Sequence, residues 1–252
     1  RLSHLSSVPE LIAATDMLVH CDQGAATTLI KMGVSMKQIR SIHQGDIIPV
    51  GEMQVKTLKG KHVGFGPLMV LKTVLSPRII KYSQNILKWL KLHRRFSKSN
   101  SAFAYEVKAE GKIVLVMGSI ALDHRTNYPV DIDLLILPYQ GSGSLQKRAT
   151  KIIRKIRPKT VILSHFDDSC PPISKSINTK KFRLSMRRRM PELNIISPQV
   201  GVPITLFEEA EAEEEKVLPE NTASALVVAE AVNTEPVSTE PKQEKGEDKH
   251  EI

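Results

Sequence analysis

The sequence predicts an α/β fold in which helices lie outside a mixed β-sheet. The apolar, β-branched residues 160–165 are typical of a strand that is covered on both faces. A helical pattern over residues 146–156 and an apolar strand over residues 132–137 precede it, which gives a βαβ unit. Residues 102–107 and 113–117 flank a Glu-Gly pair and predict a hairpin. A hairpin followed by a βαβ unit favours a mixed sheet.

The remaining elements are predicted from the signals at their ends. Pro9, in the first turn, predicts a helix that opens at Val8 and runs to about Thr15. Gly33 is the expected C-cap of a helix over residues 23–32. Glycine turns separate the short β segments that follow. The other expected strands span residues 17–21, 47–50, 53–58 and 194–204.

The net charge of +9 combines two regions of opposite sign. Residues 205–252 hold 14 acidic and 4 basic residues, a net charge of −10, which leaves +19 on residues 1–204. The acidic stretch has one aromatic residue, Phe207, and too little apolar surface to offset the entropy of ordering. We therefore expect one basic domain over residues 1–204 and a disordered acidic tail, which either screens the domain from polyanions or keeps it soluble.

Length and cysteine usage narrow the class of protein further. The chain has 252 residues, begins with Arg1 rather than methionine, and shows no signal peptide and no apolar run long enough to cross a bilayer. We expect it to be a fragment of a longer protein. Cys21 and Cys170 have no CxxC spacing and do not suggest a disulfide scaffold. Two cysteines in a chain of this length favour a reducing cytoplasm.

Histidines follow two of the predicted strands. His165 ends the strand over residues 160–165 and precedes Asp167 and Asp168, and His62 follows the strand over residues 53–58. The carboxyl ends of strands in open α/β sheets bind ligands, and histidine is the commonest metal ligand. The alternative is that each histidine lies in a solvated turn. The two aspartates either orient imidazole N–H groups or cap the loop that follows.

The order of these segments resembles the metallo-β-lactamase-fold hydrolases. The matching segments, in order, are Lys61-His62, Met117-Gly118-Ser119, residues 131–138 and residues 159–165. The likeness is greatest to the lactonase-like branch of the metal-dependent hydrolases, and it extends over residues 1–204. It implies an αββα sandwich that lacks its first strands, and a site for one or two metal ions, usually zinc, although other divalent metals also occur.

The resemblance assigns candidate metal ligands. His165 matches the family's final histidine, and His62 matches its lone middle histidine. His4 matches the last histidine of the leading His-x-His-x-Asp-His motif, but Ser3 and Arg1 stand where that motif has aspartate and histidine. The chain therefore begins inside a damaged motif, or the leading motif lies upstream.

A carboxylate that the family places after residues 113–117 is missing. Gly118-Ser119 stands there, and Asp123 follows four residues later, either as a catalytic carboxylate or as a surface aspartate of the loop. The expected activity is a metal-activated water that attacks an ester, lactone or phosphoester, so the substrate is a small molecule or a phosphoester. No separate cofactor-binding residues are expected.

Two basic segments support an alternative function. Residues 67–98 form an insertion whose helical part is a packed outer helix, a lid, or an interfacial helix on anionic lipid. Residues 183–189 hold four arginines without an aromatic platform. The alternative to the hydrolase is a catalytically impaired relative that binds nucleic acid or an anionic membrane through its basic face.

Overall fold

The computed structural model describes residues 5, 7–63, 71, 75–84, 102–168, 171 and 174–207. The chain divides into two compact units, residues 1–198 and residues 199–252. In the second unit, the described residues 199–207 contain a turn and no helix or strand. The expected disordered tail lies outside the described residues from position 208 onward, and the domain boundary at residue 204 stays a prediction.

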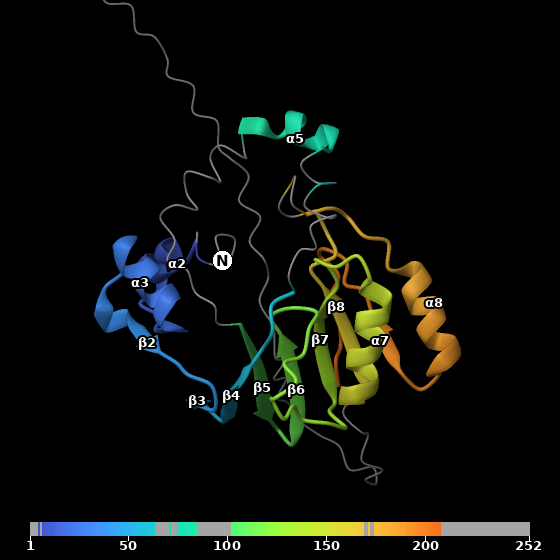
Figure 1. Ribbon diagram of the computed structural model, residues 1–252. Helices are drawn as coiled ribbons and strands as arrows, with labels where there is room; N and C mark the ends of the chain where they lie inside the picture. Colours follow the sequence, from blue (N-terminus) through green and yellow to red (C-terminus); the bar gives the residue numbers. More distant parts are fainter. Residues whose placement is uncertain are drawn as a thin grey trace, which may run out of the picture. The chain divides into compact units, whose positions relative to one another are not determined.

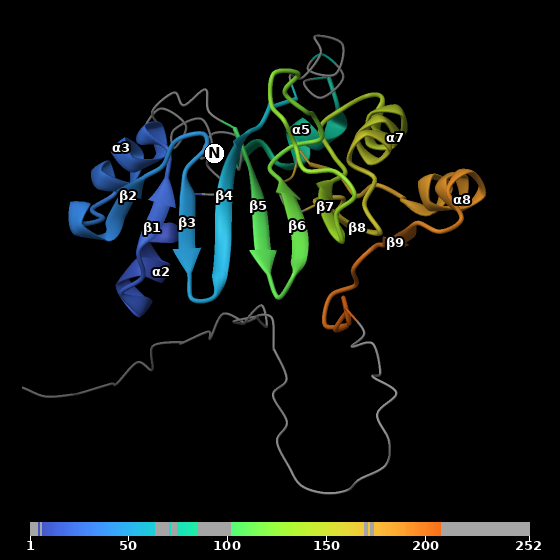
Figure 2. The ribbon, with the colours of Figure 1, turned by 90° about the horizontal axis from the view of Figure 1, so that it is seen from below.

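A seven-stranded mixed sheet forms the centre of the first unit (Figure 2). Its strands lie in the order β3-β4-β5-β6-β7-β8-β9. The pairs from β3 to β6 are antiparallel and the pairs from β6 to β9 are parallel, so the predicted mixed α/β class is confirmed. The strands are β3 (Ile47–Val50), β4 (Met53–Lys59), β5 (Phe103–Ala109), β6 (Lys112–Met117), β7 (Leu134–Pro138), β8 (Thr160–Ser164) and β9 (Asn194–Ile196).

Strand direction gathers several strand ends at one edge of this sheet. Strand β5 is antiparallel to both β4 and β6, so β4 runs in the same direction as β6. Strands β7, β8 and β9 keep the direction of β6. The carboxyl ends of β4, β6, β7 and β8 therefore lie at the same edge.

Within the first unit, a two-stranded sheet with two helices precedes the large sheet in the sequence. Strands β1 (Val19–Cys21) and β2 (Ile39–Ser41) pair in parallel, and helices α2 (Val8–Thr15) and α3 (Gln23–Lys31) accompany them (Figure 1). Asp22 caps α3, because its carboxylate accepts hydrogen bonds from the backbone N–H groups of Gly24 and Ala25. The apolar core of this part contains Ile12, Cys21, Ala26, Leu29, Val34 and Ile39.

Two helices cover one side of the parallel strands. Helix α7 (Leu145–Ile156) buries residues spaced three and four apart, which is the face that its sequence predicts. Helix α8 (Lys180–Arg189) buries Phe182, whose ring stacks on Tyr139 with the ring centroids 4.9 Å apart. The fully buried residues of this core include Leu115, Leu135, Leu137, Val161, Leu163, Ala149, Ile153 and Ile156.

Ion pairs connect the residues before β7 with the residues before β8, at the amino ends of these parallel strands. Asp133, before β7, accepts hydrogen bonds from the backbone N–H of Ile113 and from Lys159 Nζ, each at 2.8 Å. The lysine hydrogen bond is the main reason that the pKa of Asp133 lies below its ordinary value. Asp131 likewise pairs with Arg157, whose Nε lies 2.6 Å from Asp131 Oδ1. This edge of the sheet is therefore held by carboxylates with fixed partners.

Some elements differ from the expectation. Strand β9 ends at Ile196 instead of continuing to residue 204, and strand β2 was not expected. Helix α8 appeared in the sequence only as a basic cluster, because six of its ten residues are Lys or Arg and its apolar signal is weak. Of the predicted helix over residues 77–96, the structure describes α5 (Pro77–Lys81), and residues 85–96 lie outside the described part. Within the described residues, no helix has the length and apolarity that a membrane span requires.

Candidate metal centre at the carboxyl edge of the sheet

The segment that carries His62 is attached to the end of strand β6. The backbone N–H of Val63 donates a hydrogen bond to Ser119 Oγ at 3.1 Å. Gly60, two residues before His62, forms an isolated antiparallel bridge with Leu122. Ser119 thus serves as an acceptor that positions the His62 segment. This role was not visible in the sequence, because the bond joins residues 56 positions apart.

The His62 imidazole is oriented by its own neighbour. Its Nδ1 lies 2.8 Å from the carbonyl oxygen of Val63. A carbonyl can only accept, so the bond requires the proton on Nδ1 and leaves the lone pair on Nε2. Metal-binding histidines are held in this way by a hydrogen bond from the other ring nitrogen. The side chain is exposed, so Nε2 is available to a ligand.

His165 lies one residue beyond strand β8 in an unusual backbone conformation. Its φ is +55°, in the left-handed region that residues other than glycine rarely adopt. The ring is half-exposed, and its Nδ1 lies 4.0 Å from Asp167 Oδ1, which is beyond hydrogen-bond distance. A strained, exposed histidine at a strand end is a candidate for function, because such strain persists where the surrounding structure imposes it.

Asp168 belongs to a polar contact between the loop after β8 and helix α5. Its carboxylate accepts hydrogen bonds from Arg78 at 2.6 Å and from Ser174 Oγ at 3.1 Å. Arg78 also donates to the carbonyl oxygen of Ser174 at 3.3 Å. The hydrogen bond from Arg78 is the main cause that lowers the pKa of Asp168. Asp168 therefore links the insertion to the His165 loop, a pairing that could not be read from residues 90 positions apart.

Asp123 lies in a tightly bonded turn after β6. Its Oδ1 accepts hydrogen bonds from the backbone N–H of Arg125 at 3.0 Å and from Thr126 Oγ1 at 3.4 Å. Its own backbone N–H donates to the hydroxyl of Tyr128, which in turn donates to the carbonyl oxygen of Lys59 at 2.6 Å. The bond from Arg125 is the main reason that the pKa of Asp123 is lowered. These contacts account for Asp123 as a buried turn residue, and its catalytic role stays a prediction.

The two histidines lie at the same edge of the sheet but follow different strands. His62 is attached beside β6, and His165 follows β8, with β7 between them. Strands are about 4.8 Å apart, so the two strand ends are separated by about 10 Å. Among the residues that the structure describes, no group of three His, Cys, Asp or Glu side chains could hold a metal ion.

The two candidate histidines suit zinc, but the described part of the chain supplies too few ligands for a complete site. Two imidazole nitrogens suit zinc, whereas a catalytic site takes about three protein ligands and keeps one position open. His4, the third candidate, lies outside the described residues. A complete site thus requires at least one ligand from beyond them.

Comparisons with known proteins give matches to solved structures. No protein-family model matches the sequence, and no curated protein does. One match is the metallo-β-lactamase fold protein YhfI from Bacillus subtilis, with 11% identity and a TM-score of 0.44 over 77% of this chain and 70% of that chain. A second is isothiocyanate hydrolase from Delia radicum gut bacteria, with 16% identity and a TM-score of 0.35 over 78% of this chain and 58% of that chain.

A third match is Zn²⁺-bound PqqB from Methylobacterium extorquens, with 10% identity and a TM-score of 0.39. It covers 71% of this chain and 62% of that chain. The chain therefore spans less than two thirds of the second and third proteins. Of these three proteins, YhfI is described as a metallo-β-lactamase fold protein.

Proposed function

We propose that this protein is a metal-dependent hydrolase and that His62 and His165 are two of its metal ligands. The observation that carries the proposal is the placement of two exposed imidazoles after strands whose carboxyl ends share one edge. The Val63 carbonyl accepts the hydrogen bond from Nδ1 of His62, which leaves the lone pair of Nε2 for a metal. His4 is the proposed further ligand, supplied from outside the described residues.

The proposed substrates are small molecules or phosphoesters with an ester, lactone or phosphoester bond. His62 and His165 would hold the metal, which when bound would lower the pKa of a water molecule and polarise the scissile carbonyl or phosphoryl oxygen. The chain's own contribution is to orient the ligands: Ser119 fixes the His62 segment, and Asp168 with Arg78 fixes the loop that follows His165. Zinc is the proposed metal, in one or two ions, and another divalent metal with nitrogen affinity is the alternative.

Titration calorimetry of the full chain with Zn²⁺ tests the ligand assignment. We expect His62→Ala and His165→Ala each to weaken zinc binding at least about tenfold, because each removes a direct ligand. His20→Ala is the matched control, since His20 is an exposed histidine on β1 of the smaller sheet. Absence of zinc binding by the parent chain, or equal binding by all three variants, overturns the proposal.

Activity assays then test the reaction class. The full chain, with and without added zinc, is assayed against a panel of esters, lactones and phosphodiesters. We expect hydrolysis of one class that requires the metal and is lost in His165→Ala. Hydrolysis that persists unchanged in a chelator would contradict the metal-dependent mechanism.

A further inference from the structure

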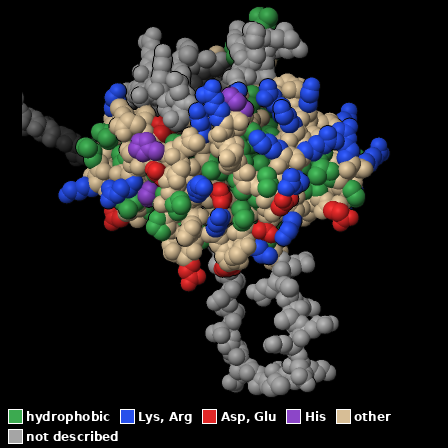
Figure 3. Space-filling view, turned by 60° about the horizontal axis from the view of Figure 1, so that its bottom comes forward, with side chains coloured by type: hydrophobic (Ala, Val, Ile, Leu, Met, Phe, Trp, Pro, Cys, Tyr) green, Lys and Arg blue, Asp and Glu red, His purple; other side chains and the backbone are tan. Residues whose placement is uncertain are grey.

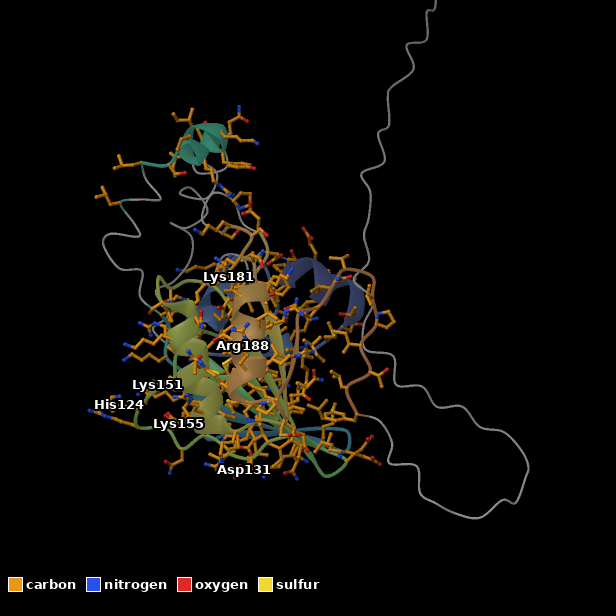
Figure 4. The ribbon with its side chains drawn as sticks, turned by 90° about the vertical axis from the view of Figure 1, so that its right-hand side faces the viewer. His124, Asp131, Lys151, Lys155, Lys181 and Arg188 are labelled. Carbon is orange, nitrogen blue, oxygen red and sulfur yellow. The ribbon has the colours of Figure 1, made fainter. Side chains whose placement is uncertain are left out.

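Helices α7 and α8 present a surface of a single charge. Together they carry eleven basic side chains and no acidic one, and all eleven are exposed. Figure 4 looks onto the two helices, with Lys151 and Lys155 on α7 and Lys181 and Arg188 on α8. We call this surface the α7–α8 basic face. Its members are Lys147, Arg148, Lys151, Arg154, Lys155, Lys180, Lys181, Arg183, Arg187, Arg188 and Arg189.

The two helices form a fixed platform for these charges. Gln146 Nε2 of α7 donates a hydrogen bond to Ser185 Oγ of α8 at 3.1 Å, and Thr150 Oγ1 lies 3.5 Å from Met186 Sδ. Both helices bury their apolar residues against the sheet, including Ile153 and Phe182. The basic side chains therefore extend from a packed surface, and binding a partner need not order the backbone beneath them.

The cations of this face lack anionic partners in the part of the chain that the structure describes. None of the eleven makes an ion pair there, although Lys155 lies over the Tyr128 ring at 5.9 Å from its centroid. By contrast Arg157 and Lys159, just beyond α7, each pair with an aspartate. In Figure 3 the Lys and Arg side chains gather on the side where α7 and α8 lie. The eleven positive charges therefore repel one another, and the positive potential of the face attracts polyanions.

Some of these basic side chains line a groove beside α8. Lys180, Arg183 and Arg187 line it at successive turns of the helix, together with Asn194 of β9. The cavity has a volume of about 400 Å³, and Glu192 is the acidic side chain on its wall. Three cations at helical spacing along one groove form a row, which suits a linear polyanion better than a single small anion.

We propose that the α7–α8 basic face binds the phosphate backbone of a nucleic-acid duplex. A duplex carries one negative charge per about 1.7 Å of its axis, and a twelve-residue helix such as α7 is about 18 Å long. A duplex segment of that length carries about ten phosphates on its two strands, and the side that faces the two helices presents about six of them. Lys and Arg contacts to phosphate carry no sequence information, so the binding is independent of sequence.

The composition of the face selects a duplex over other polyanions. A single strand is bound by stacking on aromatic side chains, and the one aromatic residue of the two helices, Phe182, is buried. A helix that lies in a membrane interface presents an apolar face outward. Here the apolar faces are turned inward, and Leu184 is the exposed large apolar residue of the two helices.

Fluorescence anisotropy of the full chain with short labelled duplexes tests this proposal, with duplex DNA and duplex RNA as separate arms. About six phosphate contacts predict a loss of about 10³ in affinity between about 50 and about 200 mM salt. Replacing Arg183, Arg187 and Arg188 together by Gln should lower the slope of log affinity against log salt by about 2.7, because each lost contact removes about 0.9.

A matched variant controls for net charge. Lys31→Gln, Lys37→Gln and Lys56→Gln together remove the same three charges from exposed positions away from α7 and α8, and should leave the slope unchanged. Equal loss in both triple variants, an affinity that salt does not change, or tighter binding of single strands or of phosphatidylserine-containing vesicles overturns the proposal. His165→Ala should leave duplex binding unchanged, so the surface is tested independently of the metal site.

Discussion

Gly118→Ala tests whether the close approach between strands β5 and β6 positions the candidate site. A Cβ at Gly118 would lie 2.7 Å from the carbonyl oxygen of Phe103, nearer than real Cβ contacts come. The obstacle is backbone, so it cannot rotate away as a side chain would. Ordinary contact begins at 3.4 Å, and the two strands must therefore separate by about 0.7 Å at this point.

The cost follows from this displacement. Forcing one extra carbon into a packed site costs about 1–3 kcal/mol, so we expect Gly118→Ala to destabilise the protein by about 2 kcal/mol. For a domain of this size that lowers the Tm by about 4–8 °C. The shift also moves Ser119, which should lengthen its hydrogen bond with Val63 and loosen the His62 segment.

Urea and thermal unfolding followed by circular dichroism measure the effect. Gly143→Ala is the matched control, because a Cβ there meets nothing within 4 Å and its φ is not in the left-handed region. We expect the control to change stability by no more than about 0.5 kcal/mol. Equal unfolding midpoints for the two variants would refute the reasoning from the Phe103 contact.

Three further outcomes are expected. Leu163→Ala should lower the free energy of unfolding by about 2–5 kcal/mol, because Leu163 is fully buried. Leu184→Ala, at an exposed position, should change it little, and urea titration of both variants measures the difference. The pKa of Asp168 is lowered by Arg78, so their pairing stabilises the fold above the unfolded carboxyl pKa of about 3.9 and this contribution is lost as the pH falls through the folded pKa. Unfolding measured across this acidic range should therefore show a smaller pH dependence in Arg78→Met. Asp123→Ala should destabilise the turn by about 1 kcal/mol, as seen in the unfolding midpoint, and a destabilisation below about 0.3 kcal/mol would show that its hydrogen bonds contribute little.

Much of the central sheet was predictable because local signals agree with the tertiary structure. The hairpin of β5 and β6 turns at Glu110 and Gly111, both with positive φ, as a tight Glu-Gly turn requires. The βαβ unit of β7, α7 and β8 has a helix with one apolar face between two apolar strands. In each case the apolar side chains that give the sequence its helix or strand periodicity are also the ones that are buried in the core.

Other parts depend on contacts that the sequence does not display. Helix α8 owes its place to two residues, Phe182 and Met186, that pack against the core, and its remaining positions are mainly charged. The sequence placed His62 and His165 after strands, and the structure adds how each is held: by the Val63 carbonyl and by a left-handed backbone. The partners Ser119 and Arg78 come from distant segments, so no local pattern indicated them.

The two edges of the large sheet differ in their chemistry. At the amino ends of the strands, Asp131 and Asp133 are committed to Arg157, Lys159 and a backbone N–H. At the carboxyl ends, the imidazoles of His62 and His165 are exposed. Substitutions at the amino edge should change the free energy of unfolding. Substitutions at the carboxyl edge should change ligand binding. A change of side chain at the carboxyl edge therefore leaves the ion pairs of the amino edge in place.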